Sequence, residues 1–332
     1  MSKQVFQSVR YITVGEDDTG QRIDNFLINL LKKVPKTRVY RMIRKGEVRV
    51  NRKRIASGYR LEAGDEIRVP PVFEDEKEAL PSPSRSLREC LLQSVLFEDE
   101  RLIIINKPAG VPVHGGVRTP IGVIEAMRMI HPEWPQLELV HRLDLDTSGC
   151  LILAKKRSTL RELHALLREG GMHKVYRVLT AGHWKANEYR VDVALEKNHK
   201  VSGERIVQVR TEGKAALTVF RPVTVYKTAS LMEAVLHTGR THQIRVHARY
   251  RGHPVAGDEK YGDKAFNQKM REVGLKRMFL HAYHIEFTLE SSGKAYSVTA
   301  PLEGELMDCL EHLPSSHSST PSFHPRAGME RE

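Results

Sequence analysis

Near the start of the chain, apolar residues recur at the spacing of an amphipathic helix. From Arg22 onward they fall at Ile23, Phe26, Leu27, Leu30, Leu31 and Val34. This i, i+3, i+4, i+7 series places them on one face of a helix. Pro35 is suited to open a second helix over Lys36–Lys45, which Gly46 would end. Short alternating strands are predicted after it at Val48–Val50, Tyr59–Leu61 and Ile67–Val69.

A larger region, residues 91–313, alternates strand-like runs with fewer helices. Strands are predicted at Leu102–Asn106, Leu151–Ala154, Val175–Thr180, Thr218–Val223, Leu231–His237, Phe279–Phe287 and Tyr296–Thr299. Helices are predicted at Ile121–Ile130, Thr159–Glu169 and Thr241–Arg251. Thr241 is a candidate cap for the last of these. Because the order lacks the regular βαβ alternation of a doubly wound fold, the class expected is α+β with a largely antiparallel sheet.

Changes in composition predict where these regions begin and end. We expect a small domain over 20–72, a linker over 73–90, a large domain over 91–313 and a disordered tail over 314–332. The linker contains EDEKE and PSPSRS and has no apolar periodicity, and the tail is rich in Ser, Pro and His. Three widely spaced cysteines and the absence of a long apolar run favour a cytoplasmic protein that does not enter a membrane.

Charge is distributed unevenly along the chain. The formal net charge is +12, and residues 22–60 alone hold thirteen Lys and Arg against Asp24 and Glu47. On the second predicted helix the apolar Val39 and Met42 mark one face, and basic residues crowd the other. Such an excess would repel itself without a partner, which predicts that the small domain binds a polyanion. A solvated charged face is the alternative.

Four polar clusters punctuate the large domain. They are Asn106–Gly110, His141–Gly149, Lys174–Tyr176 and Gly239–His247. The second is a tight polar connection between two strand-like runs and holds two carboxylates, an arginine and a histidine. Taken alone it could be an ordinary β-turn, but a loop between strands is also where a rigid scaffold presents a reactive group.

Several chemistries lack their sequence signals. The chain has 16 histidines, yet neither His242 and His247 nor His281 and His284 form a helical H-x-x-x-H pair with an adjacent Glu. There is no Walker A loop and no GxGxxG after a strand, and the D-T-S-G turn around Ser148 is weak evidence for a serine nucleophile. We therefore expect neither a metal nor a nucleotide cofactor.

Carboxylate chemistry on a nucleic acid remains. An aspartate can act as nucleophile or base at the anomeric carbon of a sugar, and in a closed site it needs a nearby cation to stay ionised. A base within folded RNA must also be flipped out and held against an aromatic face. Arg142, Tyr176 and Arg245 are available for these tasks, and at this stage Asp144 and Asp146 are equivalent candidates.

The small domain resembles the alpha-L RNA-binding domain first described in a small-subunit ribosomal protein. The matching stretches are RIDNFL, the helix end at Tyr40–Lys45, KGEVRVN and LEAGDEIRVP. The resemblance implies that this domain binds RNA. The basic residues expected to contact RNA are Arg38, Arg41, Arg44, Lys45, Arg52, Lys53 and Arg54.

The rest of the chain resembles the RluA-type pseudouridine synthases. NKPAG, HRLDLDTSG, KVY, GRTHQIRVH and FLHA match that family's ordered motifs, and the resemblance covers roughly residues 15–313. It implies that Asp144 is the catalytic aspartate and that Asp146 takes no part in the chemistry. His141 is expected to serve as a structural hydrogen-bonding residue, and Asp146–Gly149 only to form the turn.

Four further positions match residues that the family uses around the base. Arg142 matches the arginine that helps to evert the uridine, and Tyr176 the aromatic residue that packs on the base. Arg245 matches the basic partner of the aspartate, and Leu280 falls where the family places an apolar residue lining the base pocket. Without the resemblance, Tyr176 would be read as a core tyrosine and Arg245 as a surface arginine.

The function implied is isomerisation of uridine to pseudouridine in large-subunit (23S) ribosomal RNA, without cofactor or metal. The expected partner is that RNA or a ribosome precursor, and the expected state is a monomer. Two alternatives stay open, the first of them a non-catalytic protein that keeps the same fold. A non-catalytic ribosome-assembly factor would not release tritium from 5-tritiated uridine in RNA, and a nucleoside glycosidase would release free uracil.

Overall fold

The computed structural model describes residues 4–31, 34–75, 81–116, 119–201, 204–302 and 304–315. The chain divides into two compact units, the first made mostly of residues up to Ser82 and the second mostly of those from Pro83 onward. All but the first two residues of the tail predicted as disordered lie outside the described residues. Within the part of the chain that is described, no helix is long and apolar enough to span a bilayer.

The N-terminal unit contains the two predicted helices, α1 (Ile23–Leu30) and α2 (Lys36–Lys45). Gly46 ends α2 in the left-handed conformation, at φ 69°. Three strands form a sheet in the order β2 (Arg10–Thr13), β4 (Glu66–Val69) and β3 (Arg49–Val50). A separate antiparallel pair joins β1 (Gln4–Gln7) to β5 (Val72–Asp75).

One strand predicted in this unit is wrong. Tyr59 and Leu61 are not in a strand, and Arg60 makes only an isolated bridge with Arg22. The two apolar side chains do turn inward, since Leu61 is 1% exposed and the Tyr59 hydroxyl donates to buried Asp65. Alternation of apolar and polar residues over three positions indicates which side chains point inward. It does not require that the backbone pair with another strand.

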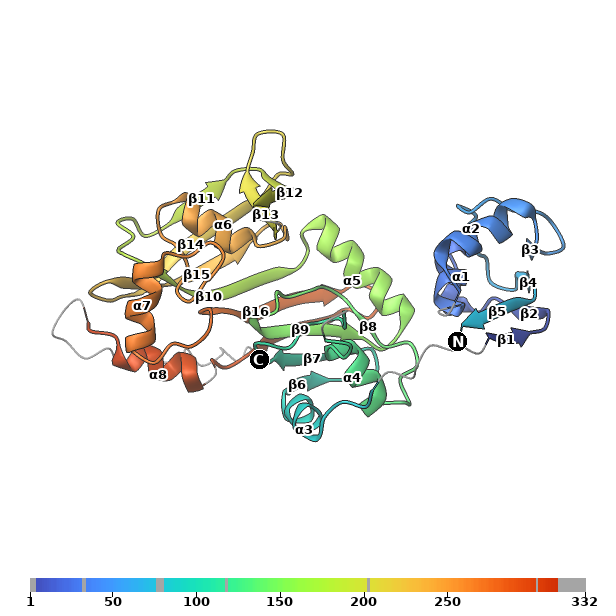
Figure 1. Cartoon of the computed structure of the whole chain (residues 1–332), viewed down its shortest axis with the longest axis horizontal. Helices are drawn as coiled ribbons and strands as arrows, with labels where there is room; N and C mark the ends of the chain where they lie inside the picture. The colour runs from blue at the N-terminus through green and yellow to red at the C-terminus, as the bar shows by residue number, and fades with distance from the viewer. Residues whose placement is uncertain are drawn as a thin grey trace. The chain divides into compact units, whose positions relative to one another are not determined.

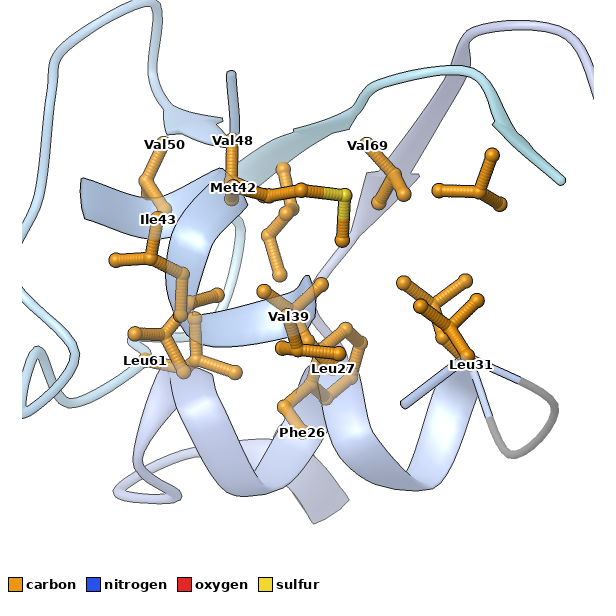
Figure 2. Packing of buried hydrophobic residues seen from close by; sticks show 14 of the residues in the cluster. Phe26, Leu27, Leu31, Val39, Met42, Ile43, Val48, Val50, Leu61 and Val69 are labelled. Carbon is orange, nitrogen blue, oxygen red and sulfur yellow. The ribbon is translucent and has the colours of Figure 1, made fainter. Parts of the chain in front are cut away.

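A single apolar cluster holds the unit together. Leu27 of α1 and Leu31, which follows this helix, pack with Val39 and Met42 of α2, and each of these side chains is fully buried (Figure 2). Val50 from the sheet side packs into the same cluster. Among the described residues, the buried members of the cluster all lie between Val14 and Val72. The unit therefore has a hydrophobic core of its own, as a separate domain requires.

The second unit is built on a ten-stranded sheet (Figure 1). Its strands are β6 (Val95–Glu98), β7 (Leu102–Lys107), β8 (Glu138–Leu139), β9 (Ser148–Ala154), β10 (His173–Ala181), β11 (Tyr189–Asp192), β14 (Leu217–Val225), β15 (Ala229–Leu236), β16 (Leu280–Leu289) and β17 (Lys294–Thr299). Eight of them run in the order β11-β14-β15-β10-β16-β9-β7-β6, with β17 pairing β16 and β8 pairing β9.

All strand pairs of this sheet are antiparallel except β9 with β16. This confirms the predicted α+β class with a mixed, largely antiparallel sheet. A separate hairpin joins β12 (Leu195–Val201) and β13 (Glu204–Val209). The helices are α3 (Arg85–Gln93), α4 (Val123–Ile130), α5 (Arg157–Glu169), α6 (Gln243–Tyr250), α7 (Lys264–Glu272) and α8 (Gly304–His312).

The linker predicted over 73–90 is wrong at both ends, because β5 runs to Asp75 and α3 begins at Arg85. Ser84 caps this helix, its hydroxyl accepting from the Leu87 amide at 3.2 Å. Leu91 is the only fully buried side chain of α3. A helix with one buried position shows no apolar periodicity in its sequence. The capping residue Ser84 was therefore the signal that could have predicted the start of α3.

Candidate active site

The HRLDLDTSG stretch forms the loop between β8 and β9, and a buried lysine holds its backbone. The Leu145 carbonyl accepts from the Gly110 amide at 2.9 Å and from Lys107 Nζ at 3.1 Å. Lys107 is 0% exposed, and its ammonium also donates to the carbonyls of Pro108 and Val111, each at 2.8 Å. The NKPAG motif therefore fixes the loop by satisfying all three donors of a buried cation.

The end of this loop is not the simple turn that was predicted. A turn does form where the Thr147 amide donates to the Asp144 carbonyl, but Ser148 and Gly149 already belong to β9. There β9 pairs in parallel with β16, Ser148 opposite His281 and Gly149 opposite Ala282. A Cβ on Gly149 would lie 2.3 Å from the Ala282 carbonyl oxygen, and its φ is +106°. Glycine is required there because both the contact and the dihedral angle exclude a side chain.

Beneath the loop lies a buried polar chain that the sequence did not indicate. The Ser148 hydroxyl and His281 Nδ1 are 2.8 Å apart, and His281 Nε2 lies 3.1 Å from the Ala300 carbonyl. Arg277 Nη2 donates to Ser148 Oγ at 2.9 Å. Burial lowers the pKa of His281 to about 4, so its ring is neutral near pH 7. The neutral ring donates from Nε2 to the carbonyl and accepts the Ser148 proton at Nδ1.

A cavity of about 610 Å³ opens above the loop and is lined by all five residues predicted to act on the base. These are Arg142, Asp144, Tyr176, Arg245 and Leu280. Two loop residues thus meet one residue each from β10, α6 and β16, elements that are far apart in sequence. The volume falls within the range of small-molecule and cofactor sites.

The aromatic and apolar residues of this cavity are buried. Tyr176 is 8% exposed and Leu280 is 4% exposed. Burial, and then the negative charge of Asp144, raise the pKa of Tyr176, which keeps the phenol neutral. Arg142 is exposed at the cavity wall. The cavity therefore combines a buried aromatic ring and a buried apolar side chain with an exposed cationic side chain.

Arg245 lies between two carboxylates. Its Nη1 donates to Asp144 Oδ2 at 3.1 Å, while Nε and Nη2 hold Asp258 in a fork at 2.7 and 2.8 Å. Burial opposes its charge, but the hydrogen bonds and charges of Asp258 and Asp144 outweigh burial and raise the pKa of Arg245. A bidentate carboxylate fixes the plane of a guanidinium. Arg245 is thus oriented by Asp258 and presents its remaining donor to Asp144.

Asp258 is a site residue that sequence reasoning missed. Its side chain is 0% exposed, and its Oδ1 accepts from the amides of Lys260 and Tyr261, each at 2.9 Å. Burial raises its pKa, but the Arg245 contacts and these amides prevail and lower it. The backbone turn after Asp258 therefore supports the arginine that holds Asp144. No local spacing marks this residue, because its partner lies thirteen positions earlier on another element.

The start of α6 also differs from its prediction. Thr241 does not cap the helix; the N-cap is His242, in the left-handed conformation and without a side-chain cap. The side chain of Gln243 instead binds the loop that precedes the helix. Its Oε1 accepts hydrogen bonds from the Arg240 amide at 2.9 Å and from the Thr238 hydroxyl at 2.8 Å. The left-handed residue turns the chain sharply, so the helix begins at Gln243.

His141 has the hydrogen-bonding role that was expected of it. Its Nε2 accepts from the Ile152 amide at 3.2 Å, which ties the loop to β9. Burial lowers the pKa of His141 to about 3, and the neighbouring charge of Lys174 acts in the same direction. A ring that is neutral and already bonded to the backbone is not available as a general base.

Positive charge dominates the cavity lining. Arg142, Arg168, Lys174, Arg240 and Arg245 contribute to it, against the single carboxylate of Asp144. Burial lowers the pKa of Lys174, which faces the cavity near Gly239. Within the described part of the chain, no group of three or more His, Cys, Asp or Glu residues is placed to bind a metal. The cavity thus suits an anionic ligand that carries a flat ring.

The N-terminal unit presents a second cationic surface, which we call the basic face. It consists of Arg41, Arg44, Lys45, Arg52, Lys53 and Arg54, all exposed. Arg38, predicted with them, is partly buried and ion-paired to Glu47 at 3.0 Å. The turn that carries three of these residues is held by Asn51, whose amide nitrogen donates to Asp65 at 2.7 Å. Asn51 and Arg52 both have positive φ, which makes this turn sharp.

Comparison with known proteins agrees with both units. Residues 101–250 match the RNA pseudouridylate synthase family and residues 21–67 match the S4 domain. Ribosomal large subunit pseudouridine synthase C of Salmonella typhi is 50% identical over 312 residues, 93% of this chain and 98% of the relative. The proteins of that name from Pasteurella multocida and Escherichia coli K12 are each 49% identical, over 96% and 92% of this chain and 98% and 97% of their own lengths.

The chain therefore belongs to the RNA pseudouridylate synthase family, with an N-terminal S4 domain, and is an RNA pseudouridine synthase. Two solved human structures share its fold. Human RNA pseudouridylate synthase domain containing 4 is 23% identical with a TM-score of 0.57, and covers 68% of this chain and 95% of its own. Human RNA pseudouridylate synthase domain containing 1 is 24% identical with a TM-score of 0.56, and covers 73% and 94%.

Proposed function

We propose that this enzyme converts uridines of large-subunit (23S) ribosomal RNA to pseudouridine, with Asp144 as the catalytic residue. The observation that carries the proposal is that Asp144 lines the same cavity as Tyr176 and lies 3.1 Å from Arg245. The substrate is supported by the relatives of about 50% identity, which are named for the large ribosomal subunit. We expect the protein to act in the cytoplasm, as a monomer, on the RNA or a ribosome precursor.

The reaction needs no external reagent. The N1–C1′ bond breaks, the uracil turns while it stays in the cavity, and a C5–C1′ bond forms. N1 gains a proton and C5 loses one, so the product is an isomer and no electrons are exchanged with a cofactor. Asp144 acts either by attacking C1′ or by removing the C2′ proton to give a glycal. Both routes use the carboxylate of Asp144, which the guanidinium of Arg245 orients by a hydrogen bond.

The uracil must neither stay in the RNA stack nor leave the enzyme. Arg142, exposed at the cavity, would enter the space that the everted base vacates. Tyr176 gives the base a rigid aromatic face, and Leu280 gives it an apolar wall. These contacts retain the base during its rotation, which distinguishes an isomerase from an enzyme that releases free uracil.

The S4 domain would add contacts to the phosphate backbone through its basic face. Phosphate contacts supply affinity and salt sensitivity and carry little information about base sequence. Arg44 and Lys45 lie in the last turn of α2, where the helix dipole favours cations. We therefore assign binding strength to this domain and the chemistry to the cavity.

The decisive experiment replaces Asp144 by Asn, which keeps the size of the side chain and removes its charge. We expect the variant to bind 23S ribosomal RNA normally and to release no tritium from 5-tritiated uridine. Asp146→Asn is the matched control, because Asp146 is exposed in the same loop and should keep full activity. Turnover by the Asp144 variant would overturn the mechanism, and free uracil among the wild-type products would indicate a glycosidase.

A further inference from the structure

His242 has an unusual backbone next to the catalytic carboxylate. Its φ and ψ are 54° and 22°, in the left-handed region that non-glycine residues seldom occupy. Its Nδ1 lies 2.8 Å from the Tyr261 hydroxyl, and its Nε2 lies 3.8 Å from Asp144 Oδ2. Backbone outliers of this kind cluster at functional sites, where the surrounding structure enforces them. In His242 the outlier directs the imidazole into the cavity.

The surroundings of Tyr261 determine which ring nitrogen of His242 carries the proton. The Tyr261 hydroxyl is buried and accepts a hydrogen bond from the Val207 amide at 2.9 Å. Its single proton is then free to be donated, and the acceptor 2.8 Å away is His242 Nδ1. The proton of the neutral ring therefore resides on Nε2, the nitrogen that faces Asp144.

The charge state of the ring agrees with this tautomer. Burial lowers the pKa of His242, and the positive charges of Arg245 and Lys260 act in the same direction. The negative charges of Asp144 and Asp258 oppose them, but the net direction is downward. The imidazole is therefore a neutral donor near pH 7, and it does not neutralise the carboxylate beside it.

Two donors are thus directed at the same oxygen of Asp144. Arg245 Nη1 donates to Oδ2, and the Nε2–H of His242 faces Oδ2 as well. Among the described residues, Oδ1 of Asp144 has no hydrogen-bond partner. One donor already holds Oδ2 by a hydrogen bond and a second donor faces it, so the structure distinguishes the two oxygens of this carboxylate.

We propose that His242 is a positioning residue for Asp144: its Nε2–H fixes Oδ2 together with Arg245, and Oδ1 is the oxygen that reacts with the nucleotide. Tyr261 sets the tautomer that makes this possible. At 3.8 Å the contact is longer than a hydrogen bond, so it must shorten in the complex with RNA for the Nε2–H to hold Oδ2. The inference rests on the proposed role of Asp144 and assigns functions to two residues beyond it.

The test removes the imidazole without disturbing the backbone. His242→Gly keeps a residue that accepts φ 54°, and tritium release from Escherichia coli 23S ribosomal RNA labelled with 5-tritiated uridine gives kcat and KM. We expect kcat to fall by about 10- to 100-fold, the usual loss when a residue that orients a functional side chain is removed. KM should be unchanged, because the ring orients the carboxylate and does not bind the RNA. Added imidazole should restore part of the missing activity.

A second variant keeps the ring and removes only the control of its tautomer. Tyr261→Phe should lower kcat less than His242→Gly does, and the double variant should be no slower than His242→Gly alone. Tyr296→Phe is the matched control: Tyr296 is a buried tyrosine that donates to Asp99 at 2.9 Å and does not line the cavity. It should leave kcat unchanged.

Each result separates this inference from the proposed function. Wild-type kcat in His242→Gly, or a loss confined to KM, would overturn the positioning role. Independent losses that multiply in the double variant would overturn the link through Tyr261. If Asp144→Asn is inactive while His242→Gly is fully active, the proposed function stands and only the role of His242 fails. Activity in Asp144→Asn would overturn both.

Discussion

At the scale of single residues, Gly149 offers a direct test of how the loop that carries Asp144 joins the sheet. Gly149→Ala places a methyl group 2.3 Å from the Ala282 carbonyl oxygen and requires an alanine at φ +106°. Backbone strain and overpacking together should lower the free energy of unfolding by about 2–5 kcal/mol. Urea unfolding followed by circular dichroism measures this loss.

Gly274→Ala is the matched control for this prediction. Gly274 has a similar φ of +92°, but nothing lies within 4 Å of the Cβ it would gain. It should show only the conformational cost, about 1–2 kcal/mol. Equal losses at the two positions would mean that the close parallel pairing of β9 with β16 does not constrain the loop.

The sequence motifs predicted the residues of the candidate site, but not the neighbouring residues that hold them in position. The motifs identified Asp144, Arg142 and Tyr176, and the fold brings these to one cavity. Asp258 escaped notice because an isolated Gly-Asp pair is most often a turn. The orientation of His242 depends on its left-handed backbone conformation, and a histidine in the sequence does not predict that conformation. Buried partners of a site residue are set by tertiary packing and leave no local pattern.

At the scale of elements, α2 tests how the S4 domain binds RNA. Arg41→Gln with Arg44→Gln removes two exposed charges of the basic face while the buried side of the helix stays intact. The slope of log Kd for 23S ribosomal RNA against log salt should decrease by about 0.7–0.9 for each phosphate that is no longer neutralised. Filter binding over a series of salt concentrations gives this slope.

The control for this prediction carries the same change of charge on another helix. Lys264→Gln with Lys269→Gln removes two exposed charges from α7 of the second unit. We expect its salt slope to match that of the wild type. An equal reduction in both double variants would show that net charge governs binding and that α2 has no special part in it.

Elements with several buried positions were predictable, whereas those with few were not. The helix at Ile23–Leu30 and the strand Leu102–Lys107 have strong apolar patterns and lie where they were expected. The missed helix α3 buries a single leucine, and α7 mixes Asn267 with its apolar buried residues. Periodicity detects a face only when enough of that face is apolar. The remaining signals were capping residues such as Ser84 and Asp263.

At the scale of the whole molecule, the uneven charge predicted a basic N-terminal module beside a more neutral one, and the structure has two compact units. What the sequence could not give is the strand order that places β9 between β7 and β16. The parallel pairing of β9 with β16 joins segments about 130 residues apart, and it brings His281 to Ser148. Local patterns contain no information about such pairing, because register across a sheet is decided by packing over its whole face.

Separate hydrophobic cores imply that binding and chemistry can be damaged independently. Leu27 is 0% exposed in a cluster formed only by residues of the N-terminal unit. Leu27→Ala should cost about 2–5 kcal/mol. A domain of this size has little stability to lose, so much of the S4 domain should unfold. For Leu27→Ala we expect weaker RNA binding, a higher KM and an unchanged kcat at saturating RNA.

The control is Leu151→Ala, at a 0% exposed position of β9, which should lower kcat. Peptide-level hydrogen exchange locates the unfolding, and tritium release gives the kinetic constants. A fall in kcat with Leu27→Ala would contradict the assignment of RNA binding to one unit and the reaction to the other.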